Sequence, residues 1–247
     1  MHTLLKVSHV VKKYGNYTAL DDVSFELYSH EIVSLLGVNG AGKTTLSSII
    51  ASLHPCTSGD VIYDGNSIYK DLIAYRRILG FCAQKQNLTA QMSVREYLEF
   101  AGRYYLMPAR EIKQRADFLI EQFGLGAHAH KHPSVLSGGY KQRLLIARSL
   151  VHNPKLVILD EPTVALDAHI RRELWEIIKG LKNMGVTVLL TTHYIDEAEI
   201  LSDRICVLHA GKIKLIDTPS ALMSSYNKNR LEDVFVALVQ EQEKSTL

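Results

Sequence analysis

The chain contains 247 residues, of which 47% are hydrophobic and 22% charged, and its formal net charge is +2. This composition is typical of a globular protein and excludes a disordered chain. Acids and bases are mixed along the sequence without a long basic stripe, so we expect no nucleic-acid partner. The three cysteines, Cys56, Cys82 and Cys206, are odd in number and far apart, which argues against a disulfide framework and fits a reducing cytosol.

The apolar runs are too short for a membrane span. The longest, 156–159 and 186–190, fall far below the roughly 20 residues that a helix needs to cross a bilayer. Residues 1–6 lack a signal-peptide cleavage pattern. We therefore expect any role at a membrane to depend on a partner protein.

The N-terminal part of the chain predicts strands, a glycine-rich loop and a helix. Residues 4–30 alternate apolar and polar side chains, which predicts antiparallel strands. The apolar run 32–36 predicts a buried strand, and residues 45–51 predict the start of a helix. The loop between them consists of Gly37, Val38, Asn39, Gly40, Ala41, Gly42, Lys43, Thr44 and Thr45.

This loop has the form Gly-x-x-x-x-Gly-Lys-Ser/Thr, which is typical of phosphate binding between a strand and a helix. Its glycines let several backbone N–H groups point into one concavity, beside the positive end of the helix dipole. Lys43 supplies a mobile charge for the outer phosphates, and the Thr44 hydroxyl is suited to Mg²⁺. The alternative is a glycine-rich turn that happens to hold a lysine. The loop alone predicts phosphate binding and leaves the use of the nucleotide open.

The middle of the chain predicts two short strands and then a helical region. Residues 58–66 predict a strand that ends in an Asp-Gly turn, and residues 79–83 predict a strand that ends at Gln84. Ser93 and Glu96 form a capping box for a helix through Tyr105. Two more predicted helices follow, one with an apolar stripe over 112–123 and one that ends near 152. We interpret residues 91–152 as an α-helical subdomain inserted into an α/β core.

Strands and helices alternate from Pro154 onward. This alternation predicts a parallel sheet covered by helices on both faces. We place a single domain at 4–235, and a helix end with a polar tail at 236–247. The predicted elements are strands at 156–159 and 186–191, helices at 170–181 and 195–201, a hairpin at 205–216 and an amphipathic helix at 231–242.

Two acids, Asp160 and Glu161, follow the apolar strand 156–159. A carboxylate at the carboxyl edge of a parallel sheet lies where such sheets bind ligands. Asp160 is suited to hold Mg²⁺ beside Thr44, directly or through water. Glu161 is suited to orient or deprotonate a water that attacks the γ-phosphate. The alternative is two acids that merely terminate a strand.

Ser137, Gly138 and Gly139 precede a helix and offer a second anion site through their exposed N–H groups. Such a motif is weak in isolation, because serine and glycine are common helix caps. One chain rarely needs two anion sites for one nucleotide. We therefore expect the second site to serve a nucleotide held by another subunit.

The order of these motifs resembles the nucleotide-binding subunit of an ABC transporter over nearly the whole chain. The resemblance implies a P-loop NTPase with a RecA-like parallel core sheet, an N-terminal antiparallel β subdomain and an inserted α-helical subdomain. It also implies an ATPase with ATP and Mg²⁺ as cofactors. The matching segments are 37–45, Gln84, the signature 136–142, 159–161, Leu166-Asp167 and His193.

The resemblance implies a role for each of these side chains. Tyr14 would stack on the adenine. Gln84 would reach the metal and the attacking water, and His193 would touch the γ-phosphate and hold the water with Glu161. Each has a plainer alternative: a half-buried strand tyrosine, a loop glutamine and a structural histidine.

The signature and the segment before Asp167 bear on the pairing of two subunits. Ser137 and Gly139 would bind the γ-phosphate of the opposite subunit, and Asp167 would lie at the dimer seam. Tyr140 replaces the glutamine common in the family, a change with little expected effect on binding. Val164 lacks the hydroxyl of the usual serine, so we expect one seam hydrogen bond fewer.

Two further stretches, 93–100 and 231–235, resemble the ATPase subunits of drug-resistance and ABC-2 exporters; plain amphipathic packing is their alternative. The implied partners are a second copy of the chain or a homologous ATPase subunit, and an integral membrane permease. The chain would then lie on the cytoplasmic face of the membrane. A non-transport ABC ATPase acting on nucleic acid or ribosomes is the competing class, and a phosphate-loop kinase or GTPase is a third.

His128, His130 and His132 alternate before the signature. On a strand they would share one face and could hold a metal. We prefer a polar linker, because no cysteine or acid lies near them in the sequence.

Overall fold

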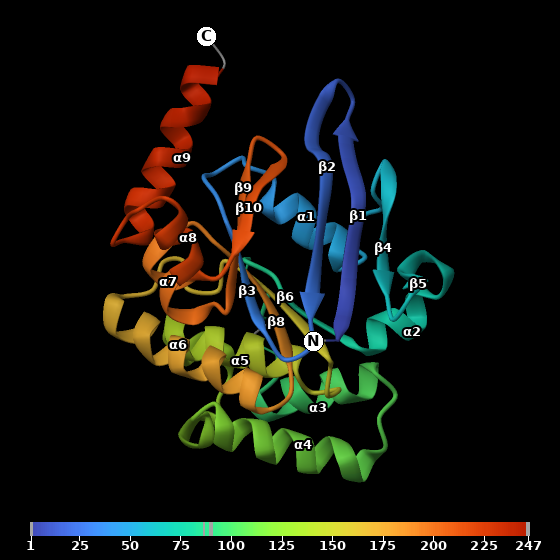
Figure 1. The fold of residues 1–247 in the computed structure, drawn as a ribbon. Coiled ribbons are helices and arrows are strands. Elements are labelled where there is room, and N and C mark those ends of the chain that lie inside the picture. Colours follow the sequence, from blue (N-terminus) through green and yellow to red (C-terminus); the bar gives the residue numbers. More distant parts are fainter. Residues whose placement is uncertain (1, 86, 89–90, 246–247) are drawn as a thin grey trace.

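The computed structural model describes residues 2–85, 87–88 and 91–245, with side chains up to residue 238. A smaller antiparallel sheet, of strand order β2-β1-β4-β5, stands beside a larger mixed sheet (Figure 1). Its strands are β1 (Thr3–Tyr14), β2 (Tyr17–Tyr28), β4 (Ser58–Tyr63) and β5 (Asn66–Ser67).

The larger sheet has the strand order β10-β9-β3-β8-β7-β6. Its neighbours from β9 to β6 pair in parallel, and only β10 joins β9 antiparallel. The strands are β3 (Ile32–Leu36), β6 (Leu79–Cys82), β7 (Leu156–Asp160), β8 (Thr187–Thr192), β9 (Arg204–His209) and β10 (Lys212–Asp217).

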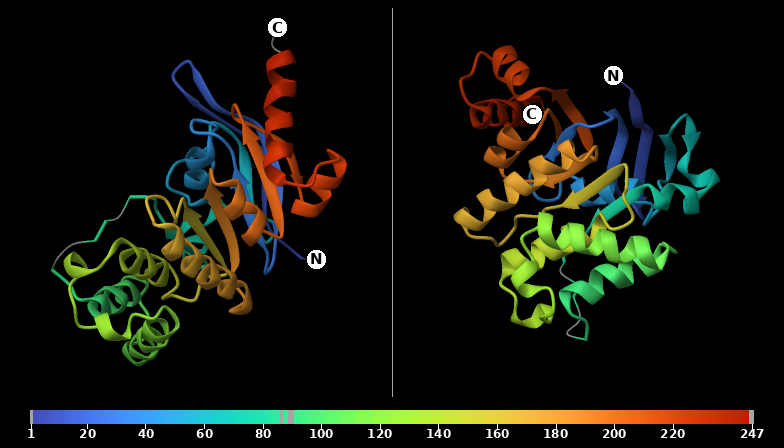
Figure 2. Two further views of the ribbon diagram at one scale, coloured as in Figure 1. Left: turned by 90° about the vertical axis from the view of Figure 1, so that its left-hand side faces the viewer. Right: turned by 90° about the horizontal axis from the view of Figure 1, so that it is seen from below.

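Helices cover both faces of this sheet, as the alternating pattern predicted (Figures 1 and 2). The described helices are α1 (Lys43–Ile50), α2 (Leu72–Arg77), α3 (Val94–Tyr104), α4 (Ala109–Gln122), α5 (Gly138–Ser149), α6 (Ala168–Asn183), α7 (Ile195–Leu201), α8 (Pro219–Ser225) and α9 (Leu231–Ser245).

Strand β7 shows how the sheet divides the core. Leu156 and Ile158 point into the apolar cluster between the two sheets, which also contains α1. Val157 and Leu159 point to the opposite face, into the cluster formed with α3 to α6. Alternate side chains of a strand face opposite sides, so a strand buried on both faces reads as the continuous apolar run seen in the sequence.

The helical region between β6 and β7 gathers at one end of the molecule, where α3 and α4 lie lowest in Figure 1. The predicted capping box opens α3: the Ser93 hydroxyl accepts from the Glu96 N–H, and the Glu96 carboxylate accepts from the Ser93 N–H. The fold class is therefore confirmed, with the antiparallel sheet and the inserted helices both present. The domain limits at 4–235 stay a prediction.

Several element boundaries differ from the prediction. Helix α1 begins at Lys43 rather than at 45, because left-handed Gly42, with φ of 106°, ends the loop there. Helix α5 ends at Ser149, short of 152, and α9 continues beyond 242 to Ser245. Residues 246–247 of the predicted tail lie outside the described residues.

Two short helices were missed in the sequence. Asp71 caps α2 and Thr218 caps α8, each by accepting the N–H three residues on. Proline at the first position of α8 is a further start signal. Both cues were present in the sequence.

The histidine-rich segment does not form a strand, so His128, His130 and His132 do not share one face. His128 ends the 3-10 turn Gly126–His128, and a second such turn spans Pro133–Val135. The centre of the His128 ring lies 4.3 Å from that of Tyr140. Among the described residues no group of three or more His, Cys, Asp or Glu side chains is arranged to hold a metal.

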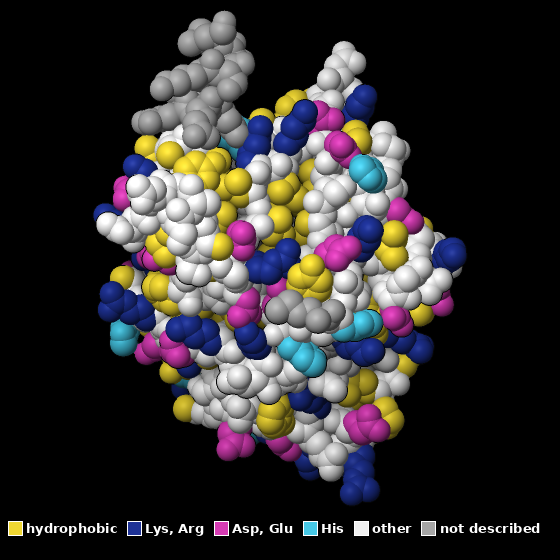
Figure 3. All heavy atoms as spheres, in the orientation of Figure 1, with side chains coloured by type: hydrophobic (Ala, Val, Ile, Leu, Met, Phe, Trp, Pro, Cys, Tyr) yellow, Lys and Arg dark blue, Asp and Glu magenta, His cyan; other side chains and the backbone are white. Residues whose placement is uncertain are grey.

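The cysteines and the charged surface residues are arranged as the composition led us to expect. Cys56, Cys82 and Cys206 are unpaired, and burial raises the pKa of Cys82 to about 12. Basic and acidic side chains are interspersed over the face in Figure 3. Within the part of the chain described here, none of the helices has the length and apolar character that a bilayer crossing requires.

Gly80 lies in β6, the strand that leads to Gln84, and it offers a test of how closely this strand packs against α5. A Cβ at Gly80 would overlap the Ser149 carbonyl oxygen of α5. We expect Gly80→Ala to lower the free energy of unfolding by about 1–3 kcal/mol, as overpacking does. Urea denaturation measures this. Gly180→Ala in α6, where nothing lies within 4 Å, is the matched control and should be neutral or stabilising. Equal effects of the two changes would contradict the close approach.

Candidate functional site

The predicted phosphate-binding loop runs from the end of β3 to the start of α1. The Ala41 N–H donates to the Val38 carbonyl over 3.1 Å, which closes a turn inside it. Gly40 and Gly42 have positive φ angles of 82° and 106°, a conformation that glycine adopts without strain. A Cβ at Gly42 would lie 2.8 Å from the Ala19 carbonyl oxygen. The glycines are thus required by the curl of the loop and by its contact with β2.

Lys43 lies inside this curl. Its ammonium donates to the carbonyls of Gly37 and Val38 over 2.7 and 3.2 Å. The Nζ atom also lies 3.6 Å from Glu161 Oε1. Burial lowers the pKa of Lys43, and the carboxylates of Glu161 and Asp160 oppose that shift. The lysine is therefore a largely desolvated side chain held between the loop carbonyls and Glu161.

Glu161 is the point where the three predicted catalytic side chains meet. The Gln84 amide nitrogen donates to Glu161 Oε2 over 3.0 Å. His193 Nδ1 lies 3.3 Å from Glu161 Oε1. The backbone holds the glutamate in place as well, because its N–H donates to the Thr191 hydroxyl and its φ is positive at 48°. Strands β6, β7 and β8 thus deliver one side chain each to the same point.

Asp160 lies beneath this group and is buried. Thr191 donates its hydroxyl hydrogen to Asp160 Oδ1. Burial raises the pKa of Asp160, and the hydroxyls of Thr191 and Thr44 and the Lys43 ammonium lower it. Thr44 is therefore among the groups that act on the Asp160 carboxylate, and its role at a metal stays a prediction.

The donor set fits a hard divalent cation. The Thr44 hydroxyl, the Asp160 carboxylate and the amide oxygen of Gln84 are the oxygen ligands that Mg²⁺ takes. A cation here would also offset the cost of keeping the buried Asp160 ionised. These three residues are the ones that could hold the metal.

A hollow of about 550 Å³ opens beside these groups. Tyr14, at the end of β1, lines its rim with half of its surface exposed. The Lys12 ammonium lies 5.1 Å from the centre of its ring, and the exposed remainder of the ring could stack on a planar base. The other lining residues are Tyr17, Ala19, Asn39, Gly40, Gly42, Lys43, Thr44, Thr45, Gln84, Glu161, Val164 and His193.

Tyr17 and Ala19 were missed in the sequence. Tyr17 pairs with Tyr14 across the turn that joins β1 and β2, which brings both rings to the rim. Recognition of the Tyr-Gly-Asn-Tyr hairpin would have predicted the second tyrosine, because opposite residues of a hairpin are neighbours.

The signature and Asp167 lie outside this hollow. Ser137 is the N-cap of α5 and Asp167 is the N-cap of α6, and both side chains are exposed. The two helix starts are adjacent, because a Cβ at Gly138 would lie 3.5 Å from the Leu166 side chain. The predicted anion-binding groups of one chain therefore form two separate surfaces. The loop residues Gly37, Val38 and Ala41 also do not line the hollow.

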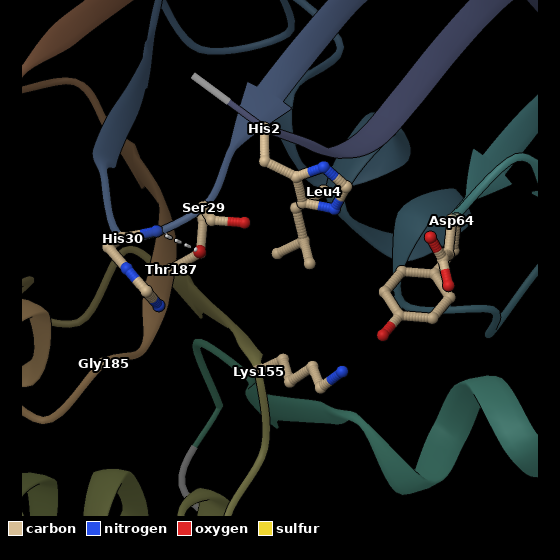
Figure 4. Close-up of a pocket in the computed structure, with 9 residues that line it drawn as sticks. His2, Leu4, Ser29, His30, Asp64, Lys155, Gly185 and Thr187 are labelled. Atoms are coloured by element: carbon tan, nitrogen blue, oxygen red, sulfur yellow. Dashed lines mark hydrogen bonds between the residues drawn. The ribbon is translucent and has the colours of Figure 1, made fainter.

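A smaller hollow of about 250 Å³ lies at the opposite edge of the larger sheet (Figure 4). The segments at the starts of β3 and β8 contribute to its wall, and none of the predicted site residues lines it. The lining residues are His2, Leu4, Ser29, His30, Tyr63, Asp64, Lys155, Gly185 and Thr187.

The strand, loop and helix, together with the acids at the end of β7, define a phosphate-loop nucleotide-binding protein. The model of the ABC transporter family matches residues 20–164. The chain therefore belongs to the ABC transporter family, as one of its ATP-binding ATPase domains.

Two relatives show how the chain compares with longer proteins. It is 40% identical over 222 residues to ATP-binding cassette sub-family A member 2 of Rattus norvegicus, a match that covers 89% of this chain and 9% of that protein. It is 39% identical over 219 residues to Nod factor export ATP-binding protein I of Rhizobium johnstonii, covering 89% of this chain and 70% of that protein.

Solved structures agree. The ATP-binding subunit of an ABC transporter superposes with a TM-score of 0.86 at 29% identity, covering 96% of this chain and 100% of that one. A dimeric ATP-binding cassette in a post-hydrolysis state, bound to ADP and Pi, superposes with a TM-score of 0.78 at 31% identity, covering 87% and 98%.

Lys43 allows a direct test of the loop. We expect Lys43→Ala to weaken ATP binding by about ten-fold to a hundred-fold, because a charge-assisted hydrogen bond contributes about 1.5–3 kcal/mol. A fluorescent-nucleotide titration measures the dissociation constant. Lys113→Ala, an exposed lysine of α4, is the control and should bind as the unchanged protein does. Unaltered affinity in Lys43→Ala would mean that the loop does not hold the phosphates.

Proposed function

We propose that the chain is the ATP-hydrolysing motor of a transporter, and that it works as one of two subunits that close over two ATP molecules. The observation that carries this proposal is the convergence of Gln84, His193 and Lys43 on Glu161. A carboxylate held by an amide, an imidazole and an ammonium at a phosphate loop is suited to hydrolysis of a terminal phosphate.

The proposed reaction begins at Lys43. Lys43 is shared between the loop carbonyls and Glu161. A γ-phosphate in the loop would compete for this ammonium, and Glu161 would then be free to accept a proton from the attacking water. His193 and Gln84 would hold the water and the phosphate oxygens in line. Positioning and charge neutralisation contribute most in such a transfer.

We propose Mg²⁺ as the second cofactor, held by Thr44, Asp160 and Gln84. The metal would neutralise charge on the β- and γ-phosphates. Tyr14 would stack on the adenine. Together with Tyr17 it would form the wall of the hollow beside the adenine.

The separation of the signature from the hollow supports a shared site. Ser137 and Gly138 lie on the exposed surface that Asp167 also occupies, and Gly139 is buried directly behind them. A second copy, or a homologous subunit, would bring this surface over the ATP, in a two-fold pairing where each chain contributes both halves. The dimeric ATP-binding cassette at 31% identity supports the same arrangement.

A membrane permease would dock in a third hollow, of about 610 Å³, beside α3. Exposed apolar side chains, among them Leu53, Phe100 and Tyr104, gather there. Such a patch on a soluble domain is typical of a protein interface. The groove lies next to the segment after β6 that carries Gln84. A permease helix docked there would therefore contact a segment that leads directly to the site. The chain would then lie on the cytoplasmic face of the membrane.

We propose export as the direction of transport. The stretches 93–100 and 231–235 resemble exporter subunits, and the Rhizobium relative is named for export of Nod factors. The cargo would be selected by the permease, whose residues contact it.

Replacement of the proposed base tests the catalytic step and the pairing together. We expect Glu161→Gln to bind ATP while its turnover falls by a factor of about 10² or more, as when a general base is lost. The chain should then elute as a dimer from a sizing column with ATP and Mg²⁺, and as a monomer without them. Glu111→Gln, at an exposed position of α4, is the control for both measurements.

Two results would contradict this account. Near-normal hydrolysis by Glu161→Gln would remove Glu161 from the reaction. A monomer at saturating ATP would contradict the shared site and favour a monomeric phosphate-loop enzyme.

A charge in the groove tests the docking surface. We expect Phe100→Glu to abolish co-purification of the permease, because a carboxylate would be desolvated at an apolar interface. Phe118→Glu is the matched control, since that phenylalanine is exposed on α4 and does not line the groove. Equal recovery of permease with both variants would place the docking surface elsewhere.

A further inference from the structure

Glu197, in the first turn of α7, is a fully buried carboxylate to which the proposed reaction assigns no role. Its Oε1 atom accepts the indole N–H of Trp175, in α6, over 2.9 Å. A buried carboxylate is costly unless its surroundings donate to it. A side chain buried at such a cost is a candidate for a specific task.

Polar groups from three different segments lie near Glu197. They are the Trp175 indole, which donates to it, and the hydroxyls of Thr192 and Thr163. Burial raises the pKa of Glu197, and these three groups oppose that shift. Both threonines are themselves buried. The carboxylate is therefore the common partner of groups that belong to β8, α6 and the loop after β7.

Each of these segments also carries a residue of the proposed site. Thr163 lies two positions after Glu161, and its carbonyl accepts the Leu166 N–H just before Asp167. Thr192 directly precedes His193. Trp175 belongs to α6, the helix that Asp167 caps.

A second set of contacts follows the same route along the outside. The rings of His193 and Tyr194 lie 4.2 Å apart. The Arg171 guanidinium lies 4.7 Å from the Tyr194 ring centre and 5.8 Å from that of Trp175. Cation–π contacts at these distances are attractive. Arg171 is one turn beyond Asp167 in α6, and its N–H donates to the Asp167 carbonyl over 2.9 Å.

We call Glu197, Trp175, Thr163 and Thr192 the Glu197 joint. Two atoms of this joint lack a partner of normal geometry among the described side chains. They are Glu197 Oε2 and the Thr163 hydroxyl oxygen, and both are buried. An unsatisfied buried polar atom is unfavourable, so each favours an approach to the other.

We propose that Glu197 is a positioning residue that holds Glu161, His193 and the loop leading to Asp167 in one arrangement. It acts through Trp175, Thr163 and Thr192, and does not touch the nucleotide. It thereby links the water-activating side of one site to the surface that faces the partner subunit. This inference rests on the proposed ATPase function and deepens it.

The test compares variants of one joint in the full chain. We expect Glu197→Ala to lower kcat at least ten-fold while the KM and the dissociation constant for ATP change less than three-fold, because the phosphate loop lies outside the joint. Glu197→Gln should recover most of kcat, since its amide can still accept from Trp175 and exchange hydrogen bonds with the threonines. Trp175→Phe should lower kcat, and add little in Glu197→Ala.

Leu201→Ala is the matched control, because Leu201 is buried in the same helix and the same apolar cluster as Trp175, and its side chain has no polar atom that could bond the carboxylate. Thermal unfolding places the variants on one stability scale. At equal loss of stability, Leu201→Ala should retain kcat. An equal fall of kcat in both variants would reduce Glu197 to ordinary packing and overturn the proposal.

Amide hydrogen exchange gives a readout that does not depend on hydrolysis. We expect faster exchange at 161–167 and 193–194 in Glu197→Ala, and not in Leu201→Ala. If the unchanged protein does not hydrolyse ATP, the proposed function fails, and the exchange result still decides the joint. Unchanged exchange at both segments in Glu197→Ala would overturn it.

Discussion

Four parallel strands of the larger sheet, β3, β6, β7 and β8, end at one edge, and the site depends on this constraint. Parallel pairing aligns their carboxyl ends, so the residues that follow them meet although they are far apart in the chain. The phosphate loop follows β3, Gln84 follows β6 and His193 follows β8, while Glu161 directly succeeds the last residue of β7. The sheet therefore assembles the chemistry, and the surrounding loops adjust it.

The charges gathered at this edge are stable only together. Lys43 and Asp160 are both buried, and burial acts against the charged form of each. The Lys43 ammonium lowers the pKa of Asp160 and the Asp160 carboxylate raises the pKa of Lys43, so each favours the charged form of the other. A site of this kind responds strongly to added charge, because a phosphate or a divalent cation changes the balance for every member at once. Nucleotide binding would thereby be connected to Glu161, the proposed base.

Much of this arrangement could be predicted from the sequence, because the relevant signals are local. The loop from Gly37 to Thr45 has a fixed spacing, β7 is an uninterrupted apolar run that ends in acids, and Ser93 and Glu96 are a capping box. Tyr17 was missed because its place at the rim depends on strand pairing with Tyr14. The start of α1 at Lys43 depended on the left-handed turn of Gly42. The histidines before the signature suggested a metal only if they formed a strand, and the backbone turns there instead.

The sequence by itself determined the class of chemistry, since residue type and spacing specify a phosphate loop, two acids and a second anion-binding segment. Only the tertiary structure decided which of these groups act together. It brought Gln84, Glu161 and His193 into contact, and it placed Ser137 and Asp167 on a separate exposed surface. It also made Glu197 a buried partner of three segments, which no local pattern around that glutamate indicates. The physical reason is that contacts between distant residues follow from how strands pair and helices pack, and short-range spacing carries no record of them.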